Sequence, residues 1–238
     1  MTEPLYLAAD PPLLFEATVE RALDDRVVLD RTGFYPEGGG QPADHGTLTA
    51  GDREWDVTDV QKQDTVYHHL ADPPAEGTAV TGRVDRERRR AHSRYHTAQH
   101  LLSAVLLDEY DAQTRGNQLY ADRARIDVEH EGFTETHLAD VETRMNDLVE
   151  RDCDVRWYTM DRERAESDLD PDRTRIDLLP DSITELRIVE IRDGDDVFDR
   201  TACAGTHVTA TGEIGSVTVE GRETGGSGRE RIRFTIDS

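Results

Sequence analysis

The sequence is organised around the stretch Arg94-Tyr95-His96-Thr97-Ala98-Gln99-His100-Leu101-Leu102, in which two histidines stand four residues apart. The apolar residues that follow include no Gly or Pro. The stretch is therefore predicted to be helical, with His96 and His100 on one face, one turn apart. A second stretch, Thr201-Ala202-Cys203-Ala204-Gly205-Thr206-His207, offers a thiolate and an imidazole. Each stretch alone is a weak signal, but together one cysteine and three histidines indicate a shared site for Zn²⁺, because Mg²⁺ and Ca²⁺ prefer oxygen ligands.

Composition separates this chain from ordinary globular proteins. Its 238 residues carry a net charge of −23 with 35% hydrophobic residues, and Lys62 is the only lysine. Carboxylates in excess, with positive charge supplied almost entirely by arginine, are what we expect of a protein that works in concentrated salt. Molar salt shortens the Debye length to about 3 Å and removes self-repulsion, while net charge keeps the protein in solution. The sequence therefore predicts a halophilic source.

Acidity ordinarily argues against nucleic-acid binding, because phosphates are contacted by a basic surface. In molar salt that argument is weak, and local arginines matter more. The largest basic cluster leads into the histidine stretch and comprises Arg83, Arg86, Arg88, Arg89, Arg90 and Arg94. Two interpretations of this cluster stay open at equal weight: it is a solvated face of the helix, or it is a strip of residues that contact phosphates.

The chain has no apolar N-terminal run typical of a signal peptide and no apolar run near 18 residues, so we expect a cytoplasmic protein without membrane spans. A disulfide between Cys153 and Cys203 is not expected in a reducing cytosol. Cys153 is instead predicted to be an ordinary strand residue.

Residues 1 to about 84 have the pattern of several short strands separated by turns, which predicts a small β-barrel. Within it, Phe34-Tyr35-Pro36-Glu37-Gly38-Gly39-Gly40-Gln41-Pro42 is rich in glycine. Such a loop is either a plain hairpin turn or an arm that approaches a ligand closely and carries Gln41 to a site elsewhere.

A domain boundary is predicted between residues 85 and 86. Beyond the histidine helix the pattern gives strands near 113–120 and 123–129, and a helix from about 134 to 150 with Thr134 as its N-cap. Further strands are expected over 155–160, 186–191, 211–219 and 231–236, with a short helix from about 161. This arrangement predicts an α+β fold.

These motifs together resemble the free-standing alanyl-tRNA editing proteins called AlaX, of the medium-length type, which are similar to the editing domain of alanyl-tRNA synthetase. The matching stretches are, in family order, Phe34 to Pro42, His96 to Leu102, Gly116-Asn117-Gln118 with Arg125-Ile126-Asp127, Cys203 to His207, and Thr211 to Gly215. The resemblance implies a translation-factor-like barrel over residues 1–85. It implies an α/β zinc-containing editing domain, as in threonyl- and alanyl-tRNA synthetases, over residues 86–238.

The resemblance also implies an activity and a site. We expect one Zn²⁺ per chain, held by His96, His100, Cys203 and His207, and hydrolysis of the ester that joins a wrong amino acid to tRNA(Ala). That amino acid is chiefly serine, with glycine as a further candidate, and a monomer is favoured. The predicted substrate-binding residues are Gly38, Gly39, Gly40, Gln41, Thr97 and Thr114, of which Gln41 and Thr97 are the candidates for positioning the substrate at the catalytic site.

The mechanism stays open at this point. Three protein ligands leave a metal position for water, whereas four are typical of a closed structural site. Whether His207 stays bound during catalysis, and which group moves a proton, are undecided; Asp127 and Glu213 could act as a base only if folding brings them near. Two other functions are retained, a zinc-dependent deacylase of another aminoacyl-tRNA and a tRNA-binding module with a structural zinc.

Overall fold

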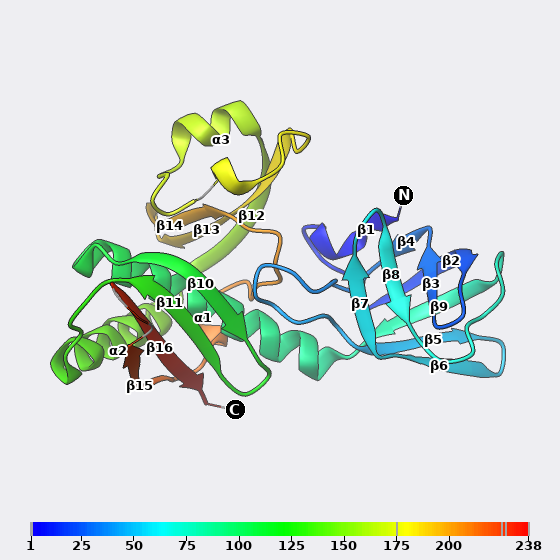
Figure 1. Cartoon of the computed structure of the whole chain (residues 1–238), viewed down its shortest axis with the longest axis horizontal. Coiled ribbons are helices and arrows are strands. Elements are labelled where there is room, and N and C mark those ends of the chain that lie inside the picture. Colours follow the sequence, from blue (N-terminus) through cyan, green and yellow to red (C-terminus); the bar gives the residue numbers. More distant parts are fainter. Residues whose placement is uncertain (1, 175, 225, 227, 238) are drawn as a thin grey trace. The chain divides into compact units, whose positions relative to one another are not determined.

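Strands in the N-terminal part of the chain pair into a seven-stranded antiparallel sheet of order β6-β5-β9-β2-β3-β8-β7 (Figure 1). The computed structural model describes residues 2–174, 176–224, 226 and 228–237, and its compact units are residues 1–91 and 92–238. The strands are β2 Leu14–Ala22, β3 Arg26–Leu29, β5 Gly46–Ala50, β6 Arg53–Val57, β7 Asp59–Lys62, β8 Val66–His69 and β9 Ala79–Val84. A small parallel pair, β1 Glu3–Pro4 with β4 Arg31–Thr32, and the 3₁₀ turn Leu5–Leu7 complete this unit.

Alternation along β2 shows how this sheet acquires its core. Phe15, Ala17 and Val19 are buried, whereas the residues between them are exposed. Since successive side chains of a strand point to opposite faces, the apolar set faces one interior, which Leu48 and Trp55 also fill. The strands predicted from this pattern are confirmed.

The closed barrel expected from the sequence is not confirmed. Among the described residues no hydrogen-bonded ladder joins β6 to β7, so the sheet has two edges. Only Thr58 separates these two edge strands in the chain, however, so the edges must approach each other at that point. The sheet is therefore strongly curled, and its edges are connected by the chain instead of by a ladder.

Helix α1, Arg86–Tyr110, carries the histidine stretch. It begins after Asp85, whose Oδ1 accepts hydrogen bonds from the backbone N–H groups of Glu87 at 3.0 Å and Arg88 at 3.1 Å. A carboxylate in this position caps the N-terminus and complements the helix dipole. The predicted domain boundary at 85/86 thus coincides with the start of the helix, whereas the compact units divide six residues later, at Ala91.

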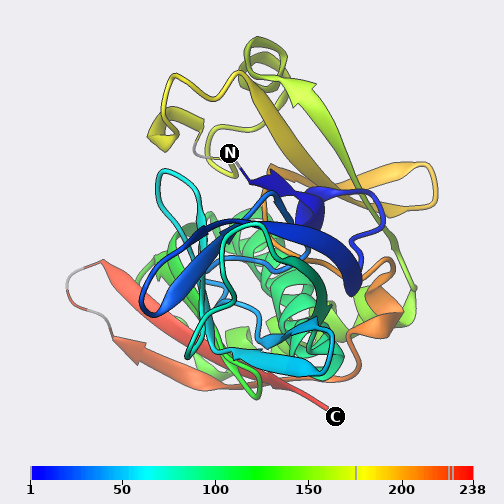
Figure 2. The same cartoon turned by 90° about the vertical axis from the view of Figure 1, so that its right-hand side faces the viewer.

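The second unit contains a four-stranded antiparallel sheet of order β10-β11-β16-β15. Its strands are β10 Gln113–Leu119, β11 Ala124–Glu129, β15 Val217–Thr224 and β16 Arg229–Ile236, and the last two run side by side in orange and red in Figure 2. Helix α2, Glu135–Glu150, contacts β15, and its buried side chains share one core with Leu101, Leu102 and Leu106 of α1. The hydroxyl of Thr134 accepts a hydrogen bond from the His137 N–H, which confirms the predicted N-cap.

A three-stranded antiparallel sheet, β12-β13-β14, carries the cysteine stretch. Its strands are β12 Asp154–Asp161, β13 Glu185–Asp193 and β14 Asp196–Ala202, with helix α3 Arg162–Asp168 and the 3₁₀ turns Ile176–Leu178 and Thr211–Glu213. Cys203 follows β14 directly. The α+β class is therefore confirmed. None of the described helices has both the length and the apolar character that crossing a membrane requires.

Candidate metal centre

Helix α1 supplies two of the four predicted ligands. His96 and His100 lie in the middle of the helix, both are buried, and their ring centroids are 5.2 Å apart. The neighbouring Leu101 and Leu102 are fully buried in the core, so the packing of α1 fixes the direction of both rings. The predicted placement of the two histidines on one helical face is confirmed.

The segment after β14 supplies the other two ligands and is held in place by Arg187 of β13. The Arg187 guanidinium donates to the carbonyl oxygens of Cys203 at 2.8 Å and Gly205 at 3.0 Å, and it stacks on Trp157 with 4.9 Å to the ring centroid. The backbone N–H of Gly205 points at Cys203 Sγ at 3.3 Å. Such an N–H stabilises a thiolate, the form of cysteine that binds metals.

The four candidate ligand atoms lie within 4.8 Å of one another, although the two stretches that carry them are far apart in the sequence. Cys203 Sγ is 3.5 Å from His96 Nε2 and 3.4 Å from His207 Nε2. Zinc–sulfur and zinc–nitrogen bonds of about 2.3 and 2.0 Å at a tetrahedral angle would place sulfur and nitrogen about 3.5 Å apart. The residues therefore fit a tetrahedral Zn²⁺ in both chemistry and spacing.

The pKa values of Cys203 and His207 favour the forms that bind metals. Burial alone would raise the pKa of the Cys203 thiol, but the three neighbouring imidazoles outweigh burial and hold that pKa well below its ordinary value. Burial, together with the charge of His96, lowers the pKa of His207 well below its ordinary value. A thiolate and a neutral imidazole are the protonation states that ligation requires.

Two residues that the sequence analysis missed stand behind His100. Asp199 of β14 is buried, and its Oδ2 lies 3.6 Å from His100 Nδ1. Arg173 donates to Asp199 through Nε to Oδ1 and through Nη2 to Oδ2, both at 2.7 Å. Burial would raise the pKa of Asp199, but Arg173 and His100 bring it down to about 2. The two-residue period of a strand could have indicated Asp199. Asp199 and Cys203 are four residues apart, so their side chains share one face of an extended chain.

Thr97 lies in the same cluster and is fully buried. Its hydroxyl is 3.0 Å from the Ser93 carbonyl oxygen, 3.2 Å from the Val208 N–H nitrogen and 3.2 Å from His207 Nδ1. Thr114 is on β10, where its hydroxyl lies 2.6 Å from that of Ser103, one turn beyond His100. The predicted contacts of Thr97 and Thr114 with substrate stay predictions.

The glycine-rich loop belongs to the first unit and forms a tight, ordered turn. Gly38 and Gln41 exchange backbone hydrogen bonds of 3.0 and 3.1 Å, while Gly39 and Gly40 have φ of 59° and 81°. Positive φ at both central positions is the requirement of a type I′ hairpin turn, which glycine meets without strain. Gln41 is fully buried within this turn. A role of Gly38, Gly39, Gly40 and Gln41 at the substrate stays a prediction.

The arginine cluster is neither a fully solvated helix face nor a continuous strip of exposed arginines. Arg89 is buried against Asp44, Arg88 donates to the Ala43 carbonyl at 3.0 Å, and Arg94 donates to the Ile214 carbonyl at 2.8 Å. These three arginines hold loops in place. Only the other three, Arg83, Arg86 and Arg90, are exposed.

The two carboxylates considered as a general base have other partners. Asp127 is held between Arg125 and Arg231 on the sheet. Glu213 accepts from the backbone N–H and the hydroxyl of Thr209. Neither is among the four residues of the cluster.

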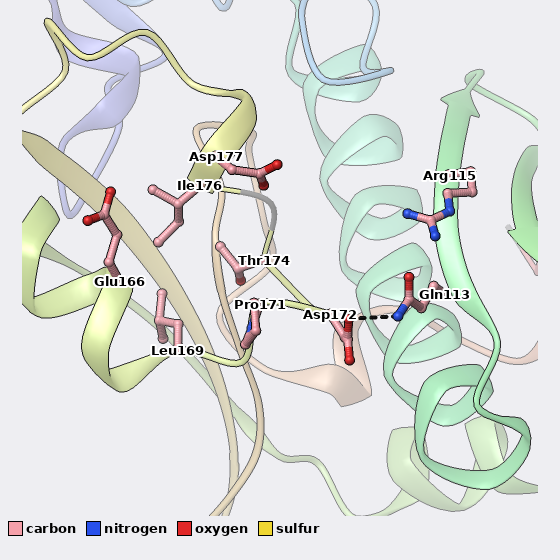
Figure 3. Close-up of a pocket in the computed structure, with 9 residues that line it drawn as sticks. All are labelled: Gln113, Arg115, Glu166, Leu169, Pro171, Asp172, Thr174, Ile176 and Asp177. Carbon is pink, nitrogen blue, oxygen red and sulfur yellow. Dashed lines mark hydrogen bonds between the residues drawn. The ribbon is translucent and has the colours of Figure 1, made fainter.

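A cavity of about 560 Å³ opens in the second unit (Figure 3). Gln113 and Arg115 of β10 line one side, and the opposite side is formed by Glu166, Leu169, Pro171, Asp172, Thr174, Ile176 and Asp177. Gln113 Nε2 donates to Asp172 Oδ1 across the cavity at 2.7 Å. One wall of the cavity contacts the stretch that carries Cys203, because the hydroxyl of Thr174 is 2.6 Å from that of Thr201, two residues before Cys203.

Comparison with known proteins agrees with this arrangement. Residues 12–88 match the family described as tRNA synthetases class II (A), and residues 186–233 match the threonyl and alanyl tRNA synthetase second additional domain. The chain is 39% identical over 245 residues to the alanyl-tRNA editing protein AlaX-M of Methanosarcina barkeri, covering 99% of both chains. It is also 41% identical over 243 residues to the alanine–tRNA ligase of Halorubrum lacusprofundi, where the match covers 98% of this chain and 25% of the ligase. The chain therefore belongs to the AlaX-M family of alanyl-tRNA editing proteins.

Proposed function

We propose that this protein is a trans-editing hydrolase that removes serine from mischarged Ser-tRNA(Ala), with Gly-tRNA(Ala) as a second substrate, and that it depends on Zn²⁺. The observation that carries the proposal is the cluster of His96, His100, Cys203 and His207 at zinc-like spacing in a chain of this family. We further propose that it acts as a monomer in the cytoplasm, with tRNA(Ala) as its partner.

The need for such an enzyme follows from the size of the amino acids. A synthetase pocket built for alanine rejects an added hydroxyl only weakly, so a second site must remove the wrong product. That second site can require the serine hydroxyl as a hydrogen-bond partner, which alanine lacks. Thr114 and Gln41 remain our candidates for this contact.

The cavity beside Thr174 supplies space for the end of the tRNA. Its volume of about 560 Å³ suits a nucleoside, and Leu169 and Ile176 offer an apolar surface for a base. Gln113 and Arg115 offer hydrogen-bond donors on the opposite side. We propose that the terminal adenosine lies here, with its ester directed at the cluster.

The four protein side chains would hold the metal, and the chain would orient the ester next to it. When bound, Zn²⁺ supplies a Lewis acid that polarises an ester carbonyl or acidifies a water molecule. Gly205, through its N–H, and Arg187, through two carbonyl oxygens, keep Cys203 in position.

The test is release of labelled serine from Ser-tRNA(Ala) in molar KCl, with Ala-tRNA(Ala) and Ser-tRNA(Thr) in parallel, before and after chelation. We expect hydrolysis of Ser-tRNA(Ala) alone and its loss on chelation. The two cysteines provide a matched pair, because Cys153 is buried outside the cluster. Cys203→Ala should abolish hydrolysis, and Cys153→Ala should leave it near the wild-type rate.

Two other outcomes would favour other functions. Faster hydrolysis of Ser-tRNA(Thr) would indicate a deacylase for that tRNA, which the threonyl and alanyl description of residues 186–233 makes a specific alternative. Bound zinc with tRNA binding but no hydrolysis would indicate a binding module with a structural metal, since four protein ligands are typical of closed sites.

A further inference from the structure

Two histidine ligands have a second ring nitrogen that faces away from the other ligand atoms. His207 presents Nε2 to Cys203 Sγ and Nδ1 to the hydroxyl of Thr97. His100 presents Nδ1 to Asp199. The group that faces this second nitrogen decides which nitrogen carries the proton, and therefore which one is free to bind a metal.

The contacts of the Thr97 hydroxyl bear on the tautomer of His207, because a hydroxyl can make only a few hydrogen bonds. A hydroxyl has one proton to donate and two positions at which to accept. The Thr97 proton goes to the Ser93 carbonyl at 3.0 Å, the usual bond of a helical threonine to the preceding turn, and one acceptor position is taken by the Val208 N–H. The remaining acceptor position faces His207 Nδ1 at 3.2 Å, which favours the tautomer with the proton on Nδ1 and an unprotonated Nε2.

Asp199 also favours a proton on Nδ1, here of His100, and does so with a charged carboxylate. Arg173 binds both carboxylate oxygens, so Asp199 can only accept. His100 Nδ1 lies 3.6 Å from Oδ2 inside a buried site, and a shift of a few tenths of an ångström would make this a hydrogen bond. A proton on Nδ1 satisfies this geometry, and Nε2 is again left free.

We propose that Thr97 and Asp199, the latter oriented by Arg173, are positioning residues that make His207 and His100 offer an unprotonated Nε2 to the metal and thereby set the affinity for it. This inference rests on the metal of the proposed function. It gives Thr97 a task other than the substrate contact predicted from the sequence, because its hydroxyl is already fully used.

The experiment measures zinc affinity by competition with a chromophoric chelator, without tRNA. Thr97→Val keeps the shape and removes the hydroxyl, whereas Thr97→Ser keeps the hydroxyl. We expect Thr97→Val to bind zinc roughly 10- to 100-fold more weakly, the usual effect of losing such a partner, and Thr97→Ser to stay within about threefold of wild type.

Asp199→Asn provides the second arm of the experiment. Its matched control is Asp193→Asn, since Asp193 is on the neighbouring strand in an exposed pair with Arg151. We expect zinc affinity to fall by a similar roughly 10- to 100-fold for Asp199→Asn and to be unchanged for Asp193→Asn. Thermal unfolding of the chelated proteins identifies any variant that fails to fold, and the Thr97 pair decides the question if Asp199→Asn does not fold.

The outcomes separate this inference from the proposed function. Wild-type zinc affinity in Thr97→Val would overturn it, and loss of hydrolysis in that variant at full zinc occupancy would show that Thr97 contacts the substrate. Conversely, the expected zinc affinities in a protein that hydrolyses none of the tested tRNAs would support the inference while the proposed function fails.

Discussion

Removing the carboxylate of Asp44 should destabilise the first unit strongly. Asp44 is fully buried and Arg89 nearly so; the guanidinium binds Asp44 through Nη2 and through Nε at 3.0 and 3.1 Å. Asp44 Oδ2 also accepts the Tyr35 N–H at 2.6 Å. In Asp44→Ala, the Gly33 carbonyl at 2.7 Å is the one partner of Arg89 that remains among the described residues, so a buried charge and a buried N–H lose their bonds to the carboxylate. We expect a loss of about 3–5 kcal/mol in the free energy of unfolding.

The chain contains two tryptophans, and each unit has one. In a Trp157→Phe background, the fluorescence of the buried Trp55 therefore reports the unfolding of residues 1–91 alone. Urea titrations in molar KCl give the free energy without adding a denaturing salt. The control is Glu3→Ala, which removes a half-exposed pair with Arg31 at 3.7 Å and should cost less than about 1 kcal/mol.

A double variant tests whether the loss of stability comes from a buried charge without a partner. Asp44→Leu with Arg89→Met removes both charges, so neither remains buried without a partner, and it should be more stable than Asp44→Ala. A cost below about 1 kcal/mol for Asp44→Ala, or a double variant less stable than the single one, would refute the assignment of this pair as a buried ion pair that stabilises the first unit.

Two further predictions concern pH and the cavity. Burial lowers the pKa of His68 from 6.5 to about 4, so the unfolded chain binds a proton that the native unit does not. The free energy of unfolding should therefore fall by about 3 kcal/mol as pH drops from 6.5 to 4, and urea titrations of His68→Gln should show a smaller fall. Gln113→Trp, which places a large ring in the cavity, should lower kcat/KM for Ser-tRNA(Ala) roughly tenfold or more with unchanged zinc content. Ile183→Trp, exposed and outside the cavity lining, should leave kcat/KM unchanged in the same steady-state assay.

Local patterns in the sequence predicted most elements of the fold. The alternation around Phe15 and the cap at Thr134 are local, and the structure has the strand and the helix there. Closure of the sheet depends on how far it curls, and no residue pattern near Thr58 encodes that. The burial of Arg89 depends on the carboxylate of Asp44, 45 positions earlier in the chain. The neighbouring Arg88 and Arg90 therefore gave no indication that Arg89 is buried.

The four residues of the cluster could be predicted because each pair keeps a spacing of four residues within one stretch. Asp199 and Arg173 could not be predicted, because their contacts form only when the folded chain brings the Asp199 carboxylate of β14 next to the His100 ring of α1. The hydroxyl of Thr97 was noticed for its closeness to the ligands. Its contact with Ser93 is local to the helix, whereas its contacts with Val208 and His207 depend on the folded chain.

The position of β16 at the end of the chain determines when the four-stranded sheet can form during translation. This strand pairs with β11 on one side and β15 on the other, so the four-stranded sheet cannot be complete until residue 236 has left the ribosome. Cys203 likewise emerges 107 positions after His96, so the nascent chain exposes two imidazoles long before their thiolate exists. All ladders of the seven-stranded sheet, in contrast, lie within residues 14–84 and can form while the remainder is still being translated. Capture of the proposed metal by all four residues can therefore occur only late in synthesis, when the first unit is already free to fold.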